Sequence, residues 1–492
     1  MKKKRSIFFS SLFVLLLFPI QLNENAEGHT IIKFSSNHSI VEDSKEVKFP
    51  DKNLEEAVRE AINKPNGNIY VGDVKEIEEL IANNKNISDL EGIQYLTGLK
   101  KLNLKFNDIQ DISLLSNLKN LQSLHLGYNN ISDISPLENL ITLTDLNLES
   151  NKISDIDKLS KLVQLEFLSL YNNKVSNLRP LNTLVKMKDI NLYINKIQDI
   201  NPLGGLVNLE SLSLGMNQIS NIESIESLNN LKTLELAENN VSDIEPLSKL
   251  TKLNDLYLYG NQITDIKPLG SLKRLKYLDL SNNKITDVSG LRLLENLKRL
   301  SIENNELDDV KGLGSLKSME SLVLSNNQIS NIDELGSLNN LKLLKVNNNK
   351  IRDVKSLGKL RNLMVVDISQ NQISDITPLM LVDALALTNI NFSDNPLPKY
   401  VFDDKLYQQF ILSMLFPYIE KSIQKYYGEF RQYMNEGIID IESTQDGLKI
   451  KVVLRTFVGP HNPPYGLDTN TFVKSGSEIK EVDFNHQDVK FP

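Results

Sequence analysis

Four ionisable residues near the C-terminus have side chains of the types that bind metal ions: His461, Asp468, Asp483 and His486. Imidazole nitrogens and carboxylate oxygens are common ligands of zinc. Their spacing matches no recognised ligand set, and a rigid, proline-shaped turn is the simpler interpretation of the loop around His461. We therefore expect no metal and no other cofactor.

Sequence motifs of catalysis are absent from the chain. It contains no His-Glu-x-x-His, no phosphate-binding loop, no Gly-x-Ser-x-Gly and no dinucleotide fingerprint. Cysteine is also absent, which excludes disulfides, thiolate metal sites and cysteine catalysis. The formal charge of −8 argues against nucleic acid as the main partner. We expect a protein that is not an enzyme and that does not bind nucleic acid.

Asparagine is the residue with the most regular spacing. The frame Leu102-x-Leu104-x-x-Asn107-x-Ile109 recurs with a step of 22 residues, and its copies carry Asn107, Asn129, Asn151, Asn173, Asn195, Asn217, Asn239, Asn261, Asn283, Asn305, Asn327, Asn349 and Asn371. A fixed period in the twenties is typical of a solenoid, and this frame indicates leucine-rich repeats.

The leucines and the asparagine of each repeat have different expected roles. Leu102 and Leu104 lie two residues apart, so both point to one face of a short strand and fill the interior of the coil. An amide side chain both donates and accepts, so Asn107 and its copies can satisfy the backbone of adjoining coils. We predict a buried structural ladder rather than a ligand site, and each Asn→Ala change should cost roughly 1–3 kcal/mol.

Proline marks the opposite side of the coil. It stands seven residues after the asparagine in six copies: Pro136, Pro180, Pro202, Pro246, Pro268 and Pro378. Proline lacks the N–H group that a central strand needs, so this side should be turn or short helix. The array should therefore curve, with its strands on the concave face.

Large aromatic residues occupy strand positions that point away from the core: Phe167, Tyr171, Tyr193, Tyr257, Tyr259 and Tyr277. Acidic residues are interleaved with them: Asp145, Glu149, Asp189, Glu235, Asp255, Asp279 and Glu303. Aromatic anchors with a charged rim are typical of protein-binding hot spots. The alternative is that strands favour aromatic neighbours on any face. We interpret these six aromatic residues as the protein-binding surface.

The predicted fold is an α/β leucine-rich-repeat solenoid with an N-terminal helical cap and a small C-terminal α+β domain. Five parts follow one another: a signal peptide at 1–26, a flexible leader at 27–46, the cap at 47–79, the repeats at 80–397 and the C-terminal domain at 400–492. The signal peptide is indicated by four basic residues at 2–5, followed by a short apolar run at 7–20. An uncleaved N-terminal anchor is the alternative.

The cap is predicted from helix signals before the repeats. Leu54, Val58 and Ile62 fall four residues apart after Asp51, which is typical of an amphipathic helix with an acidic start. A second short helix is expected to begin at Asp73. The ends of a solenoid need such a cover.

The region from about 47 to 397 resembles the internalin family. The resemblance is carried by Phe49-Pro50-Asp51 before the first helix, by the segment Ile87-Ser88-Asp89-Leu90-Glu91-Gly92-Ile93, and by the 22-residue coils. It implies a secreted or surface protein of a Gram-positive bacterium, whose curved repeat array binds host or other proteins. Family members differ in what their concave faces hold.

The C-terminal part departs from that family. Internalins usually continue with an immunoglobulin-like domain, and many end in a Leu-Pro-x-Thr-Gly sorting signal, which is not found here. The last coil carries two extra residues, so its asparagine is Asn395. Residues 400–492 predict one helix, with apolar residues at Leu406, Phe410, Met414, Tyr418 and Tyr426 and a break or kink at Pro417. Four strands should follow, at 438–441, 448–457, 469–473 and 479–484. The loop Gly-Pro-His-Asn-Pro-Pro-Tyr-Gly at 459–466 resembles that of a small domain of unknown function from secreted proteins of bacilli.

Two classes of function remain open for this sequence. In the first, a secreted monomer without membrane insertion binds a protein through its concave face; a host surface protein is one candidate, which would imply adhesion and virulence. In the second, the repeats target an enzymatic or ligand-binding domain at 400–492. A cytosolic regulatory repeat protein is a third interpretation, against which the signal peptide argues. We expect release to the medium or loose association with the cell wall.

Overall fold

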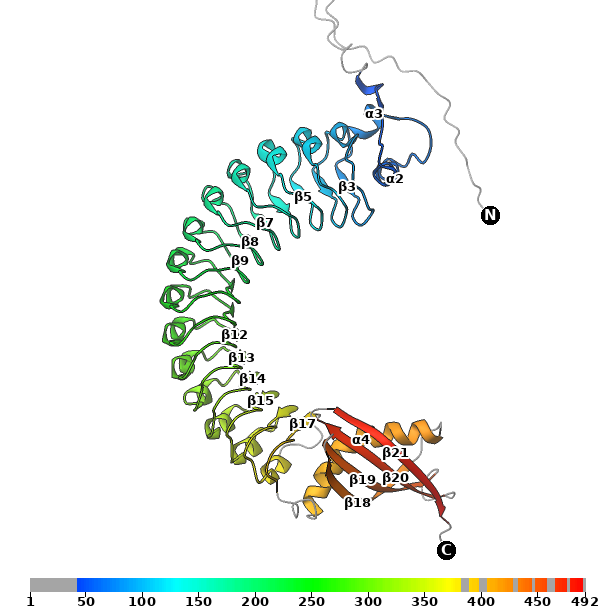
Figure 1. Ribbon diagram of the computed structural model, residues 1–492, viewed down its shortest axis with the longest axis vertical. Coiled ribbons are helices and arrows are strands. Elements are labelled where there is room, and N and C mark those ends of the chain that lie inside the picture. The colour runs from blue at the N-terminus through cyan, green and yellow to red at the C-terminus, as the bar shows by residue number, and fades with distance from the viewer. Residues whose placement is uncertain are drawn as a thin grey trace, which may run out of the picture.

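The computed structural model describes residues 42–381, 389–397, 405–427, 432–444, 447–457, 465–475 and 478–489. Figure 1 shows a curved array of coils that leads into a small helix-and-sheet domain. The predicted signal peptide, most of the predicted leader and His461 lie outside the described residues.

The repeats form one parallel sheet of 15 short strands that follow one another in chain order. Strand partners stand one repeat apart, as in Thr233 opposite Asp255 and Leu234 opposite Leu256. The strands line the inside of the arc in Figure 1 and confirm the predicted solenoid with its strands on the concave face. They are β3 (Glu79–Ile81), β4 (Lys101–Asn103), β5 (Ser123–His125), β6 (Asp145–Asn147), β7 (Phe167–Ser169), β8 (Asp189–Asn191), β9 (Ser211–Ser213), β10 (Thr233–Glu235), β11 (Asp255–Tyr257), β12 (Tyr277–Asp279), β13 (Arg299–Ser301), β14 (Ser321–Val323), β15 (Leu343–Lys345), β16 (Val365–Asp367) and β17 (Asn389–Asn391).

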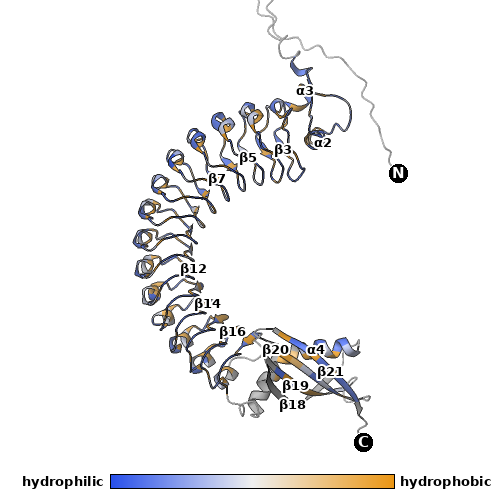
Figure 2. Ribbon diagram, viewed as in Figure 1, coloured by the Kyte–Doolittle hydropathy of each residue, from blue (hydrophilic) through white to orange (hydrophobic). Residues whose placement is uncertain are grey.

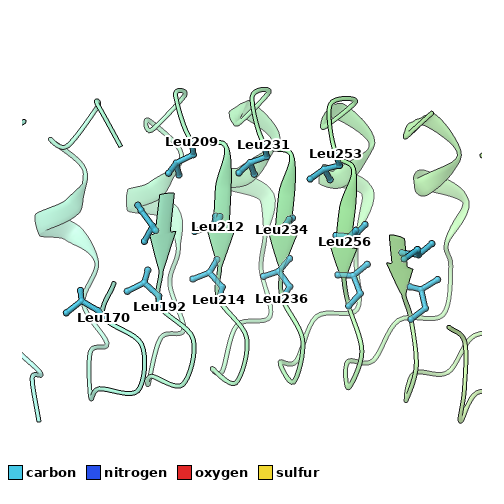
Figure 3. Close-up of a cluster of buried hydrophobic side chains, with 14 of the residues drawn as sticks. Leu170, Leu192, Leu209, Leu212, Leu214, Leu231, Leu234, Leu236, Leu253 and Leu256 are labelled. Carbon is cyan, nitrogen blue, oxygen red and sulfur yellow. The ribbon is translucent and has the colours of Figure 1, made fainter. Parts of the chain in front are cut away.

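The core runs through the array as parallel rows of leucine. Figure 3 shows Leu212, Leu234 and Leu256 side by side on neighbouring coils, with Leu214 and Leu236 forming the next row. All five are fully buried. Burying a leucine side chain stabilises the folded state by about 1.5–3 kcal/mol. A single coil cannot bury its leucines alone, because they pack against the leucines of the neighbouring coils. Stacking is therefore what stabilises each coil.

Short 3₁₀ helices form the outer side of the arc, as the prolines predict. Pro136 and Pro246 stand in the first turns of two of them, where a missing N–H costs nothing. These helices are η1 (Ile93–Tyr95), η2 (Ser113–Asn117), η3 (Ser135–Asn139), η4 (Asp157–Lys161), η5 (Arg179–Leu181), η6 (Asn201–Leu203), η7 (Glu223–Ser227), η8 (Glu245–Lys249), η9 (Lys267–Ser271), η10 (Ser289–Leu293), η11 (Leu313–Ser315), η12 (Asp333–Ser337), η13 (Lys355–Lys359) and η14 (Thr377–Leu381).

The repeated asparagines join each coil to the one before it. The Nδ2 group of Asn239 donates to Leu214 O at 3.0 Å in the preceding coil and to Leu236 O at 3.1 Å in its own. Its Oδ1 accepts from the backbone N–H of Ile219 at 2.9 Å. The same inter-coil acceptor bond is made by each of the thirteen repeated asparagines and by the shifted Asn395. The side chains thus supply the backbone contacts that a continuous helix or sheet would supply.

The N-terminal end of the sheet is covered by helix α2 (Lys52–Ala61). Asp51 caps α2 by accepting from the backbone N–H groups of residues 53 and 54. Strand β1 (Glu46–Val47) pairs with β2 (Ile69–Tyr70), and helix α3 (Val71–Val74) follows directly. The predicted start of this helix at Asp73 is wrong by two residues. Asp73 lies at its third position and accepts from the backbone N–H of Tyr70 at 2.8 Å, so it closes the first turn from inside.

The C-terminal part has helix α4 (Lys405–Tyr427) and an antiparallel sheet in the order β18-β19-β20-β21. The strands are β18 (Gln432–Thr444), β19 (Gly447–Phe457), β20 (Tyr465–Ser475) and β21 (Glu478–Val489). Each strand is longer than the range predicted for it from the sequence. These elements agree with the predicted small α+β domain. Figure 2 shows apolar residues on the array and on this sheet.

The predicted break in helix α4 and the predicted burial of Tyr426 are corrected. The helix runs through Pro417 without interruption. Its fully buried residues are Leu415, Ile419 and Ile423. The predicted Tyr418 packs partly buried against the core, whereas the predicted Tyr426 is 53 % exposed. The side chains of Leu406, Phe410 and Met414 lie outside the described ones. No helix in the described part of the chain has the length and apolar character needed to cross a membrane.

Candidate functional site on the concave face

Each coil presents three outward side chains on the concave face: the first and third residues of its strand and the residue two places further on. On β11 these are Asp255, Tyr257 and Tyr259, and the residues between them, Leu256 and Leu258, are fully buried. The pleat of the strand therefore sends alternate side chains to the core and to the open face.

Five of the six predicted aromatic residues contact another of the six, in two groups: Tyr171, Tyr193 and Tyr259, and Tyr257 with Tyr277. The rings of Tyr171 and Tyr193 stack with centroids 5.9 Å apart, and those of Tyr257 and Tyr277 lie 4.8 Å apart. The hydroxyl groups of Tyr193 and Tyr259 form a hydrogen bond of 3.2 Å. This bond joins residues 66 positions apart, across two intervening coils.

Phe167 stands apart from this group. It is the first residue of β7 and is 46 % exposed. Its strand neighbours at the same level are Asp145 and Asp189. Among the described residues its ring makes no stacking contact with the five tyrosines. It is a separate exposed aromatic residue on the same face.

Small residues make room for the contact between Tyr193 and Tyr259. At the same level on the two intervening coils stand Gly215 and Ala237. A β-carbon at Gly215 would lie 2.4 Å from a ring carbon of Tyr193, so only glycine allows the ring to lie there. Ala237 is fully buried beneath. These two small residues thus form the floor over which the two tyrosines meet.

Carboxylates surround these rings. Glu235 lies directly beside Tyr257 in the strand register, and burial raises its pKa above the usual value. Burial also raises the pKa of Asp189, although a hydrogen bond from Ser211 opposes the change. The pKa of Tyr257 is raised, first by burial and then by nearby acids, so its hydroxyl is neutral at physiological pH. We name Asp189, Tyr193, Glu235, Asp255, Tyr257 and Tyr259 the tyrosine–carboxylate cluster.

A third aromatic pair on this side of the array was not predicted from the sequence. Phe106 and Tyr128 are 49 % and 40 % exposed, and their rings stack at 4.3 Å with an angle of 14°. Both stand directly before a ladder asparagine, where the backbone is left-handed (φ 57° and 56°). Asparagine accepts this conformation readily and fills the position in coils such as those of Asn304 and Asn348, whereas a bulky ring is strained there by about 1 kcal/mol or more. An aromatic residue directly before a ladder asparagine is therefore a signal in the sequence that could have indicated this pair. Backbone strain is often retained where a side chain has a function.

A serine, a histidine and an aspartate also meet on the concave face without forming a catalytic triad. Asp145 Oδ2 accepts from Ser123 Oγ at 2.8 Å and lies 2.8 Å from His125 Nε2. The same Nε2 atom lies 3.3 Å from Ser123 Oγ. A triad needs one ring nitrogen for the serine and the other for the carboxylate. This cluster therefore cannot relay a proton in that way.

The candidate metal-ligand residues are only partly brought together. Asp468 and His486 face each other on β20 and β21, with Asp468 Oδ1 at 2.6 Å from His486 Nδ1. Tyr427 of α4 and Thr456 of β19 also donate to this buried carboxylate. Asp483 is exposed. No group of three or more potential ligands occurs among the residues that the structure describes. Here the carboxylate of Asp468 joins the helix to the sheet.

Comparisons with known proteins agree with both parts of the fold. The model described as a leucine-rich repeat region matches residues 208–415, and one described as leucine-rich repeats in two copies matches 97–139 and 119–161. The model described as a protein of unknown function (DUF3888) matches residues 407–488. It confirms the predicted resemblance of the C-terminal domain. No curated protein sequence matches the chain.

Solved structures give the family. A leucine-rich repeat protein of Leptospira interrogans has a TM-score of 0.60 at 30 % identity, over 65 % of this chain and 84 % of its own. A TDR receptor has a TM-score of 0.60 at 25 % identity, over 66 % and 61 %. An internalin (inlF) from Listeria monocytogenes has a TM-score of 0.63 at 35 % identity, over 65 % of this chain and 96 % of its own. This chain belongs to the internalin family.

Proposed function

We propose that this chain is a secreted binding protein that holds another protein on its concave face, with a surface protein of a host cell as the candidate partner. The observation that carries the proposal is the group of contacting tyrosines on outward strand positions, where no packing in the core requires them. Large aromatic residues dominate the energetics of protein interfaces. Membership of the internalin family supports protein binding as the general function.

The face has the composition of a binding surface as well as the shape. Half-buried tyrosines lie at its centre, and charged residues such as Asp255 and Asp279 flank them. The array curves around this face (Figure 1), so a partner placed there contacts several coils at once. Contact over many coils is what allows a surface of short strands to reach a stable interface.

The proposal is tested by filling the floor of the face with a large side chain. Ser213 is the third residue of β9 and lies beside Glu235 in the register. In the purified full chain, Ser213→Trp should reduce binding to the surface of host cells by at least about tenfold, because the indole occupies the space of the partner's central contact. Binding is measured by flow cytometry with the labelled chain.

The matched control is Ser242→Trp, at an exposed position outside the strands. This variant should bind as the wild type does. If Ser213→Trp binds with unchanged affinity, the concave face is not the binding surface. If both variants lose binding equally, the effect is not specific to that face.

A separate prediction concerns secretion. The basic residues at 2–5 and the apolar run at 7–20 should direct export, so the chain expressed in a Gram-positive host should be recovered from the medium with an N-terminus near residue 27. N-terminal sequencing measures this directly. Leu15→Arg in the apolar run should retain the precursor in the cell. Recovery of an intact Met1 from the membrane fraction would instead support an uncleaved anchor.

A further inference from the structure

The acids of the tyrosine–carboxylate cluster form no ion pairs with the described residues, although paired acids are common elsewhere in the array. Just before the strands, Glu166 pairs with Lys188 at 2.6 Å, and Glu210 pairs with Lys232 at 2.5 Å. On the concave face itself, Lys105 reaches Glu149 at 2.8 Å, across the open level above Gly127. None of Asp189, Glu235 and Asp255 forms an ion pair within the described residues.

Glu235 is the clearest example of an acid that lacks a partner. Its side chain is half-buried, burial alone accounts for its raised pKa, and it accepts no hydrogen bond from a described residue. A carboxyl with a raised folded pKa stabilises the protein when protonated, and this contribution is lost as the pH rises through that pKa. Ionisation of Glu235 therefore costs the isolated chain stability. An unpaired acid retained under such a cost is suited to a cation that arrives with the partner.

The tyrosines set the shape that the cation must have. Tyr257 stands next to Glu235 on the neighbouring strand, while Tyr193 and Tyr259 are joined by their hydroxyl groups along one side. The floor between them consists of small residues: Ser211, Ser213 and Thr233. Tyrosine faces attract cations through the negative potential of the ring. A flat cation that can both stack and donate several hydrogen bonds fits these groups.

We propose that the partner inserts an arginine side chain into the tyrosine–carboxylate cluster, with Glu235 and Asp189 accepting from the guanidinium and the tyrosine rings stacking on it. Guanidinium is planar and more weakly hydrated than ammonium, so it leaves water more readily and binds carboxylates in a bidentate manner. The proposal rests on the proposed function, since it specifies what the concave face recognises. The net charge of −8 further favours a partner with a basic surface.

The test uses the full chain with ¹³C-labelled tyrosine rings and the peptide acetyl-Gly-Arg-Gly-amide as probe. The arginine peptide should shift the resonances of Tyr193, Tyr257 and Tyr259 in a saturable way. The peptide with citrulline in place of arginine has the same shape but no charge, and it should bind at least about tenfold more weakly. A lysine peptide should also bind more weakly than the arginine peptide.

Variants locate the site. Glu235→Gln should weaken binding of the arginine peptide at least about fivefold without lowering the melting temperature, because it removes an unpaired, half-buried carboxylate. Glu303→Gln is the matched control, because it removes the same charge from the same face. The Glu303 carboxylate already accepts a hydrogen bond from Asn326, so this variant should leave peptide binding unchanged.

Equal binding of the arginine and citrulline peptides, or binding insensitive to Glu235→Gln, overturns the arginine proposal. Preference for lysine overturns its guanidinium specificity. Binding of the chain to cells, tested with Ser213→Trp, is a separate readout, so the two proposals can fail independently.

Discussion

Replacing Asn239 with alanine is expected to lower the free energy of unfolding by about 2 to 3 kcal/mol, because it leaves buried backbone groups without partners. The side chain is 6 % exposed and lies at the middle of the array. Its loss removes the acceptor of the Ile219 N–H group and the donor to Leu214 O, both in the preceding coil. Because the bonds of this asparagine lie within its own coil and the preceding one, the effect should centre on the junction between these two coils.

Two measurements on the full chain check this expectation. Urea denaturation followed by circular dichroism gives the loss of stability, and amide hydrogen exchange should show faster exchange at Ile219. Asn240→Ala is the matched control. It is the same substitution at the next residue, which is exposed to solvent. It should shift stability by less than about 0.5 kcal/mol. Equal effects of the two substitutions would contradict the structural role of the ladder.

The architecture of the repeats follows from the sequence because period and position decide it. A strand of three residues buries only its central side chain, as β10 buries Leu234. Once the repeat gives the position of this leucine, the position of the strand is known. The two-residue insertion in the last coil was also visible, and Asn395 accepts from Ile373 N–H at 3.0 Å just as the regular asparagines do. Outside the repeats no period fixes the position of an element. The start of α3 and the buried residues of α4 were therefore predicted less accurately.

The arrangement of the concave face could be anticipated only in part. Side chains alternate between the two faces along β11 and the residues after it, which places Tyr257 and Tyr259 on the open side. This orientation can be predicted from the sequence. The bond between Tyr193 and Tyr259 depends on side-chain rotamers across three coil junctions, and on Gly215 leaving space for a ring. No pattern within a single repeat contains this information. The left-handed backbone before each ladder asparagine was equally hidden, so the strained pair Phe106 and Tyr128 was overlooked.

The double substitution of Tyr257→Ala with Tyr259→Ala is expected to abolish most of the binding to the protein partner. Removing aromatic anchors at the centre of an interface costs at least about 2 kcal/mol, which is roughly thirtyfold in Kd. The two rings carry the contacts with Tyr277 and Tyr193, so their loss opens the centre of the tyrosine–carboxylate cluster. Binding of the labelled full chain to the cell surface measures the effect.

The control for this prediction lies between the two tyrosines. Leu258 is fully buried, so Leu258→Ala should lower stability by about 2–5 kcal/mol through the cavity it leaves. The tyrosine rings are half-buried against one another rather than in the core, and an aromatic cross-strand pair contributes only about 0.2–1 kcal/mol. The double tyrosine variant should therefore melt close to the wild type while it loses binding, whereas Leu258→Ala should show a clear loss of stability. If the tyrosine variant still binds, or melts as early as the leucine variant, the rings serve the fold and another surface of the array holds the partner.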